Sequence, residues 1–148
     1  MRAERTPALI VAEASGRYAA RAPLVADCSV LAAVLFDEPN RDVAMQALAG
    51  KDLFAPELIA DELVSVAIKK SRHGLDDVVR QALVDFTELE LTRCRTDIHA
   101  QWRLALKYEL SAYDAAYLWL AAELGAPLAT FDARLGGAAR QLLGVPNR

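Results

Sequence analysis

Four acidic residues stand at positions where the pattern of their own segments makes a carboxylate unusual. They are Asp27, Glu62, Asp114 and Asp132. An ionised carboxylate on a buried face costs free energy unless it is paired or binds a cation. Hard divalent ions such as Mg²⁺ prefer oxygen ligands, and carboxylates also supply the negative charge that holds them. If the four side chains meet, the chemistry that they favour is the binding of a divalent metal ion.

Asp27 and Asp132 each follow a short apolar run that is typical of a strand buried on both faces. The two runs are residues 24–26 and residues 128–131. In open α/β sheets, ligands bind beyond the carboxyl ends of the strands, which is where both acids are expected. The alternative for either residue is the N-cap of a helix, where Asp is also common.

Glu62 and Asp114 lie on the apolar faces of two predicted helices. Glu62 shares a face with residues such as Val66, and Asp114 shares a face with Tyr117, at spacings of three and four residues. For Glu62 the alternative is an ion pair with an arginine. For Asp114 it is a capping box, in which the carboxylate reaches back to the amide of Ser111.

Alternating strands and helices must bring these acids together. Strands are predicted at residues 24–26, 53–55, 89–92 and 127–131. Helices are predicted at residues 29–36, 41–49, 57–72, 75–86, 96–108, 111–124 and 133–143. Ser29 is the predicted N-cap of the first helix, and Pro56 is predicted in the first turn of the third. This order indicates an α/β fold, a three-layer sandwich whose central sheet is mostly parallel, has about four to five strands and carries helices on both faces.

Length and composition bound the class of protein. With 148 residues, of which 54% are hydrophobic, we expect a single domain at residues 23–148. Residues 1–22 show no clear period and are predicted to be a flexible N-terminal extension, with a docking helix or an upstream start codon as alternatives. The apolar runs are too short for a membrane span or a signal peptide, so we expect a cytoplasmic protein.

Charge and motifs exclude several other classes. The net charge of −3 argues against a strongly basic nucleic-acid binder, although metal ions held by acids change the local sign. The two cysteines, Cys28 and Cys94, have no metal-ligand spacing and are expected to be small, buried thiols. The common signatures of nucleotide-binding proteins, zinc proteases and esterases are absent.

The segments around the four acids resemble the motifs of PIN-domain ribonucleases, and most closely the VapC toxins of bacterial toxin–antitoxin pairs. The resemblance extends over about residues 24–143. Its four motifs are residues 24–31, 55–63, 111–121 and 130–132. The third motif, Ser-Ala-Tyr-Asp-Ala-Ala-Tyr-Leu-Trp-Leu-Ala, is the most specific. Four such motifs in this order resemble the family far more closely than any one of them does alone.

The resemblance implies a divalent-metal-dependent endoribonuclease, a hydrolase that cleaves RNA phosphodiesters with a water activated by Mg²⁺ or Mn²⁺. The four acids would be both the catalytic residues and the metal ligands, with Asp27 and Asp114 as the main ligands. Ser29 and Thr130 would orient these ligands. No covalent nucleophile is needed for such a mechanism.

Basic residues must hold the RNA. Arg134 lies close to a predicted strand end, whereas Lys69, Lys70 and Arg72 lie near the end of a predicted helix. The three residues at the helix end are also explained by the helix macrodipole, which favours cations there. The resemblance suggests a structured RNA such as a transfer RNA as the substrate.

The resemblance also implies partners. VapC-like proteins are usually homodimers, and a cognate VapB-like antitoxin covers their acidic site, often with a basic side chain among the carboxylates. The residues Leu31, Val34 and Leu35 and the predicted helices of Trp102 and Trp119 are candidates for the apolar contact surface. No membrane is expected to take part.

Two features depart from the family pattern, and several alternatives stay open. Ser65 stands where family members often carry Asn, and the extension before the first strand is usually lacking in such toxins. The alternatives are a PIN-domain nuclease in RNA processing, a metal-dependent phosphatase, and a non-catalytic PIN-like or receiver-like domain that binds a partner through its acidic patch. A receiver needs a lysine near the closing strand, but the chain has none after Lys107.

Overall fold

The computed structural model describes residues 21–144, so the predicted N-terminal extension lies outside the described residues except at its end. The strands are β1 (Ala22–Ala26), β2 (Lys51–Pro56), β3 (Leu91–Cys94) and β4 (Leu128–Ala129). The helices are α1 (Cys28–Leu35), α2 (Arg41–Leu48), α3 (Ile59–Arg72), α4 (Asp76–Glu88), α5 (Ile98–Tyr108), α6 (Ala112–Leu124) and α7 (Ala133–Leu143). Each predicted strand and helix has a counterpart in this order.

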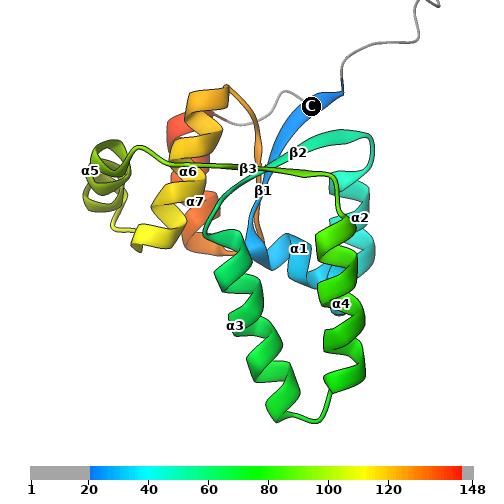
Figure 1. Cartoon of the computed structure of the whole chain (residues 1–148). Helices are drawn as coiled ribbons and strands as arrows, with labels where there is room; N and C mark the ends of the chain where they lie inside the picture. Colours follow the sequence, from blue (N-terminus) through cyan, green and yellow to red (C-terminus); the bar gives the residue numbers. More distant parts are fainter. Residues whose placement is uncertain (1–20, 145–148) are drawn as a thin grey trace, which may run out of the picture.

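The strands form one parallel sheet in the order β3-β2-β1-β4, which confirms the predicted α/β fold (Figure 1). β1 pairs on one side with β2, where Leu24 lies opposite Leu53, and on the other side with β4, where Ala26 lies opposite Ala129. The chain therefore leaves β1 toward one edge of the sheet and returns to β4 on the other side. The crevice that ligands use in such sheets lies at the carboxyl ends of these two strands.

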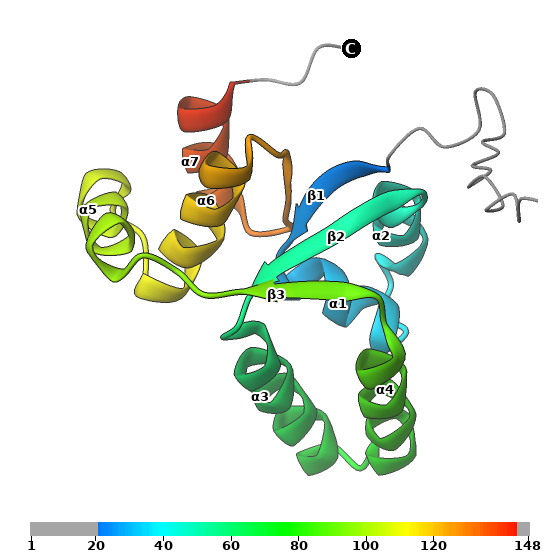
Figure 2. The same cartoon turned by 45° about the horizontal axis from the view of Figure 1, so that its top comes forward.

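Helices lie on both sides of the sheet and complete three layers. Figure 2 shows α5, α6 and α7 on one side, and α1 and α2 on the other. Of these helices, α6 packs against β1, β2 and β4, whereas α1 packs against α2, α3 and α4. The helices α3 and α4 pack against each other and project beyond the sheet. No helix in this part of the chain is both long and apolar enough to cross a membrane.

The main hydrophobic core is formed by the sheet, the central helix α6 and the inward faces of α1, α3, α4 and α7. Residues Val25 and Ala55 of the strands are fully buried, as is Ile59 at the start of α3. α6 is apolar around most of its circumference, as expected for a helix that is covered on several sides. Its buried residues are Ala115, Ala116, Tyr117, Leu118, Leu120 and Ala121. The third motif of the sequence is therefore also the central packing helix of the domain.

Two predictions about element ends are wrong. The N-cap of α1 is Asp27 rather than Ser29, because the backbone carbonyl of Asp27 already accepts the amides of Val30 and Leu31. Pro56 is the last residue of β2 rather than part of a helix, because the extended chain continues until the amide of Glu57 bonds the carbonyl of Cys94.

The last predicted strand is also shorter than expected. β4 covers two residues, whereas residues 127–131 were predicted. After Ala129 the chain leaves the sheet, because the amide of Asp132 bonds the side-chain oxygen of Thr130 at 2.9 Å instead of a neighbouring strand. The turn that results carries the residues that surround Asp27.

Replacement of Ile59 by Ala tests the position of the core. Ile59 is fully buried at the start of α3, so Ile59→Ala is expected to lower the free energy of unfolding by about 2 to 5 kcal/mol. Val64 on the same helix is 47% exposed, so the matched variant Val64→Ala should change it by less than about 0.5 kcal/mol. Urea denaturation measures both, and equal losses would contradict the described packing.

Candidate active site

Asp27 is the one buried charged side chain in the described part of the chain, with 5% of its surface exposed. Since Ala26 pairs with Ala129, the next residues along the two strands, Asp27 and Thr130, lie side by side. The hydroxyls of Ser29 and Thr130 donate to Oδ2 of Asp27 at 2.8 and 2.6 Å. Both bonds go to the same oxygen, so among the described residues Oδ1 has no hydrogen-bond donor and is available to a ligand.

Each of these hydroxyls also accepts a backbone amide. The Ser29 hydroxyl accepts the amide of Phe131 at 3.0 Å, and the Thr130 hydroxyl accepts the amide of Asp132 at 2.9 Å. Because each oxygen receives a proton from the backbone, its own proton is directed at Asp27. The turn after β4 is thereby fixed against the end of β1.

Glu62, on α3, is half-buried and is bonded to Tyr117 of α6. The Tyr117 hydroxyl donates to Oε1 of Glu62 at 2.6 Å, and no arginine within the described residues forms the ion pair that was the alternative for this acid. Burial raises the pKa of Glu62, the bond from Tyr117 lowers it, and the charges of Asp27 and Asp114 raise it further. Burial and the neighbouring Glu62 raise the pKa of Tyr117, which keeps this hydroxyl protonated as a donor.

Asp114 lies in the first turn of α6, where Ser111 is the N-cap. The Ser111 hydroxyl accepts the amide of Asp114 at 3.1 Å, but the described structure contains no return bond from the Ser111 amide to the carboxylate. Helix capping therefore accounts for a serine at position 111 but not for an acid at position 114. Burial raises the pKa of Asp114, as do the charges of Asp132 and Asp27, whereas Ser111 and Arg134 lower it.

Asp132 is the exposed N-cap of α7. Its Oδ1 accepts the amide of Leu135 at 2.8 Å, so the N-cap alternative holds for this residue. Its Oδ2 has no hydrogen-bond partner among the described residues. Asp27 also occupies an N-cap position, but its side chain makes no capping bond.

The four acids form one electrostatic group. The charge of Asp27 raises the pKa values of Glu62 and Asp114, and the charge of Asp132 also raises the pKa of Asp114. In the described residues no lysine, arginine or histidine forms an ion pair with any of them, whereas ion pairs do form elsewhere, as between Lys70 and Glu38. Oxygen donors that carry uncompensated negative charge fit a hard divalent cation. Between residues 21 and 144 no three acids already surround one point, so a bound ion would have to draw the side chains together.

Comparison with known proteins identifies the family of the chain. The chain matches the PIN domain family over residues 24–141, a span that includes all four acids. The chain belongs to the PIN-domain family. It is 31% identical to Ribonuclease VapC3 of Pyrobaculum aerophilum over 119 residues, which are 76% of this chain and 91% of that protein. The predicted resemblance to VapC-like ribonucleases is thus confirmed.

A solved structure supports the fold of this PIN domain. The crystal structure of PAE2754 from Pyrobaculum aerophilum superposes on it with a TM-score of 0.63. The alignment covers 82% of this chain and 94% of the other, at 21% sequence identity. At that identity the likeness concerns the arrangement of strands and helices alone.

The basic residues predicted to hold RNA lie in two places. Arg134, in the first turn of α7, is close enough to Asp114 to lower its pKa, and it lines a cleft of about 300 Å³ together with Lys107. Lys69 and Arg72 lie on α3 roughly 10 to 15 Å beyond Glu62 by the rise of the helix. The structure therefore brings only the arginine of α7 to the acids.

Lys70 is explained by contacts within the PIN domain. Its ammonium group pairs with Glu38 at 3.2 Å and lies 5.5 Å from the centre of the Phe36 ring. Both contacts connect α3 to the end of α1. These contacts explain the position of Lys70 without any contact to RNA.

Tyr117 is the residue of the site whose role the sequence did not predict. A tyrosine in an otherwise apolar helix face needs a hydrogen-bond partner for its hydroxyl once it is buried. The sequence therefore indicated that the Tyr117 hydroxyl needs a partner if it is buried. The sequence did not indicate which residue the partner is, because Glu62 lies 55 positions earlier in the chain.

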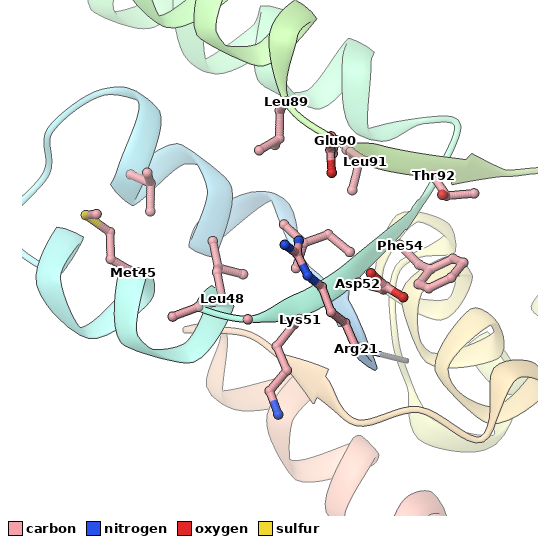
Figure 3. Close-up of a pocket in the computed structure, with 14 residues that line it drawn as sticks. Arg21, Met45, Leu48, Lys51, Asp52, Phe54, Leu89, Glu90, Leu91 and Thr92 are labelled. Atoms are coloured by element: carbon pink, nitrogen blue, oxygen red, sulfur yellow. The ribbon is translucent and has the colours of Figure 1, made fainter. Parts of the chain in front are cut away.

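A cavity larger than the cleft of Arg134 lies away from the acids. It has a volume of about 860 Å³ and is lined by residues of α2, β2 and β3, including Leu48, Lys51 and Leu91 (Figure 3). Lys51 pairs with Ala22 at the amino end of the sheet, whereas the acids follow the carboxyl ends. None of the four acids lines it, so size alone does not identify the site.

The raised pKa values of Glu62 and Asp114 predict how stability depends on pH without metal. Between the ordinary values of 4.5 and 3.8 and the raised ones, the folded protein binds more protons than the unfolded chain. The free energy of unfolding therefore falls as the pH rises through this interval. We expect metal-free Asp114→Asn to be more stable than wild type at neutral pH by about 1 kcal/mol, and to lose less stability as the pH rises.

Urea denaturation in a chelator at about pH 4 and about pH 7.5 measures this effect. The control is Asp61→Asn, which removes an exposed acid next to Glu62 and should leave the stability unchanged. A neutral-pH stability of Asp114→Asn at or below that of wild type would show that the acids do not repel one another.

Proposed function

We propose that this VapC-like PIN domain is a divalent-metal-dependent endoribonuclease that acts as the toxin of a toxin–antitoxin pair. The observation that carries the proposal is that four acids lie close enough to interact electrostatically and that none of them forms an ion pair within the described residues. Membership of the PIN-domain family and the likeness to a protein named as a ribonuclease support nuclease activity.

In this proposal the acids hold Mg²⁺ or Mn²⁺. Asp27, through its free Oδ1, and Asp114 are the main ligands, and Glu62 and Asp132 complete the set directly or through water. Divalent ions in such a site lower the pKa of water and stabilise the charge that develops on phosphate oxygens. Ser29 and Thr130 keep Asp27 oriented, and Tyr117 does the same for Glu62.

The protein's own thiol near the site is a poor nucleophile. Burial and the charges of Glu62 and Asp27 raise the pKa of Cys28 to about 12, so the thiol stays protonated at neutral pH. Water rather than a side chain is therefore the attacking group in the proposed hydrolysis.

Arg134 supplies positive charge near Asp114, and Lys107 lies near Arg134. They line one cleft between the end of α5 and the start of α7, which gives the phosphates of an RNA strand a place next to the proposed metal site. That the substrate is a transfer RNA stays a prediction from the family resemblance. The toxin would act in the cytoplasm, where such RNA is found.

A VapB-like antitoxin needs an apolar surface, and α3, the helix that carries Glu62, exposes one together with the start of α4. Val64 and Ile68 lie one helical turn apart on α3, the helix of Glu62, and are 47% and 46% exposed. Leu75 and Val78, around the start of the adjacent α4, are 42% and 37% exposed. An antitoxin that packs on these residues could extend a basic side chain to the carboxylates.

The predicted homodimer needs a second apolar surface. α5 exposes a row of large apolar residues, Ile98, Trp102 and Leu106, at 71%, 60% and 65%. Such a row can pack against its own copy about a two-fold axis. Of the residues predicted for the contact surface, Leu31 belongs to the core, and Val34, Leu35 and Trp119 are partly buried against core residues. The helix of Trp102 is the predicted element that stays available for such a contact.

The nuclease proposal is tested by RNA cleavage with and without metal. In Mg²⁺ or Mn²⁺ the wild type should cleave a transfer RNA mixture, and a chelator should abolish cleavage. Glu62→Gln and Asp114→Asn should lose about 100-fold or more in rate, because each removes a proposed ligand. The matched control Asp61→Asn should cleave as wild type does. Cleavage that survives the chelator, or both ligand variants, would contradict the proposal.

Arg134→Ala should weaken RNA cleavage roughly tenfold and lessen its dependence on salt, since it removes one phosphate contact. It should not weaken Mn²⁺ binding, because the guanidinium repels cations. Arg80→Ala is the control, since Arg80 is exposed on α4 and pairs with Asp77 at 3.9 Å. Equal cleavage by all three proteins would show that Arg134 does not contact RNA.

The toxin proposal is tested in cells. Expression should stop growth, Asp27→Asn should remove the toxicity, and the product of an adjacent small gene should restore growth and co-purify with the protein. Ile68→Glu should stay toxic and escape this rescue, whereas Val43→Glu, at an exposed position on α2, should still be rescued. Cleavage of RNA without any effect on growth would favour a role in RNA processing. Absence of both would favour a non-catalytic domain.

A further inference from the structure

Phe131 exposes an aromatic ring directly beside the acidic group. It is 40% exposed and immediately precedes Asp132 in the turn after β4. Consecutive Cα atoms are about 3.8 Å apart, so the ring originates within one residue of a proposed metal ligand. A second aromatic residue, Tyr113, is 60% exposed and immediately precedes Asp114. Exposed aromatic residues therefore stand beside two acids that interact with each other.

The backbone of Phe131 is held by the acidic site itself. Its amide donates to the Ser29 hydroxyl at 3.0 Å, and the same hydroxyl donates to Asp27 at 2.8 Å. The flanking residues are also tied, because the amide of Asp132 bonds the Thr130 hydroxyl and the Asp132 side chain caps α7. The ring is thus exposed on a fixed backbone. Tyr113 has no such hydrogen bonds to Asp27 through a hydroxyl in the described structure, so Phe131 is the better candidate for a contact with substrate in a defined position.

Among the groups of an RNA strand, the negative charge around Phe131 favours contact with the uncharged bases over contact with the phosphates. The phosphates of RNA are repelled by the acids unless metal ions lie between them, whereas the bases are uncharged. Aromatic side chains stack on unpaired bases, and each such contact commonly strengthens binding about 5- to 150-fold. Bases within a duplex are already stacked and are not available to a side chain.

We propose that Phe131 stacks on one unpaired base next to the phosphodiester that is cleaved. The inference rests on the proposed nuclease function and narrows its substrate to a single-stranded segment, such as a loop, rather than a duplex. What the inference adds is the role of Phe131 as a substrate-binding residue, with no part in metal binding.

The test uses an RNA hairpin whose loop the wild type cleaves, and a set of the same hairpins with one abasic nucleotide at each loop position. Phe131→Ala and Phe131→Leu should both raise KM about 5- to 150-fold, whereas Phe131→Trp should keep a KM near that of wild type. Leucine is the sharp comparison because it keeps most of the apolar surface without an aromatic face. Mn²⁺ binding and thermal stability should be the same in all variants. Leu124→Ala, at a similarly exposed apolar position at the far end of α6, should have no effect.

The abasic hairpins identify the base that is stacked. One abasic position next to the cleaved bond should raise the KM of the wild type as much as Phe131→Ala does. On that RNA the substitution should have no further effect, because both changes remove the same contact. Additive effects at every position, a wild-type KM for Phe131→Leu, or cleavage of the fully paired RNA with the same KM would overturn the inference. If the wild type cleaves no RNA in Mg²⁺ or Mn²⁺, so that a hairpin for this test cannot be found, the proposed function is overturned instead.

Discussion

Repulsion between carboxylates that lie close together is the constraint on which this structure depends. Asp27 is almost completely buried, and its charge acts on Glu62 and Asp114, whose pKa values are raised. The protein offsets this cost locally with hydroxyls rather than with basic residues. Ser29 and Thr130 bond Asp27, and Tyr117 bonds Glu62. Hydroxyls stabilise the carboxylates and leave their net charge intact, so attraction for a cation is preserved.

The same hydroxyls connect the site to the fold. Thr130 reaches Asp27 because β1 and β4 are neighbours in the sheet, and Tyr117 reaches Glu62 because α6 is the helix packed in the centre of the domain. A residue that supports an acid is therefore also a residue of the sheet edge or the core. A change in the packing of α6 would alter the position of Glu62 as well as the stability of the domain. Stability and function are not separable at these positions.

The sequence predicted the parts of this site that depend on local pattern. Asp27 and Glu62 could be identified because each interrupts or ends an apolar run, and the order of strands and helices was correct. The sequence could not predict what depends on contacts between distant segments. The family resemblance implied that Ser29 orients Asp27, and the two residues are bonded, but the bond of Ser29 to the turn after β4, about a hundred residues further along the chain, was not predicted. Leu31 was a candidate for a contact surface, but the packing of α1 buries it.

The binding of Mn²⁺ to the wild type and to Asp114→Asn tests the central claim most directly. Isothermal titration should show binding by the wild type and at least about tenfold weaker binding by the variant, while thermal unfolding shows that the variant is folded. Asp114 is the decisive residue because an acid in the first turn of a helix is also favoured by the helix macrodipole, without any metal. If the wild type binds no Mn²⁺, or if the folded variant binds it equally well, the four acids are not a metal site. The acidic group would then be a surface for a basic partner.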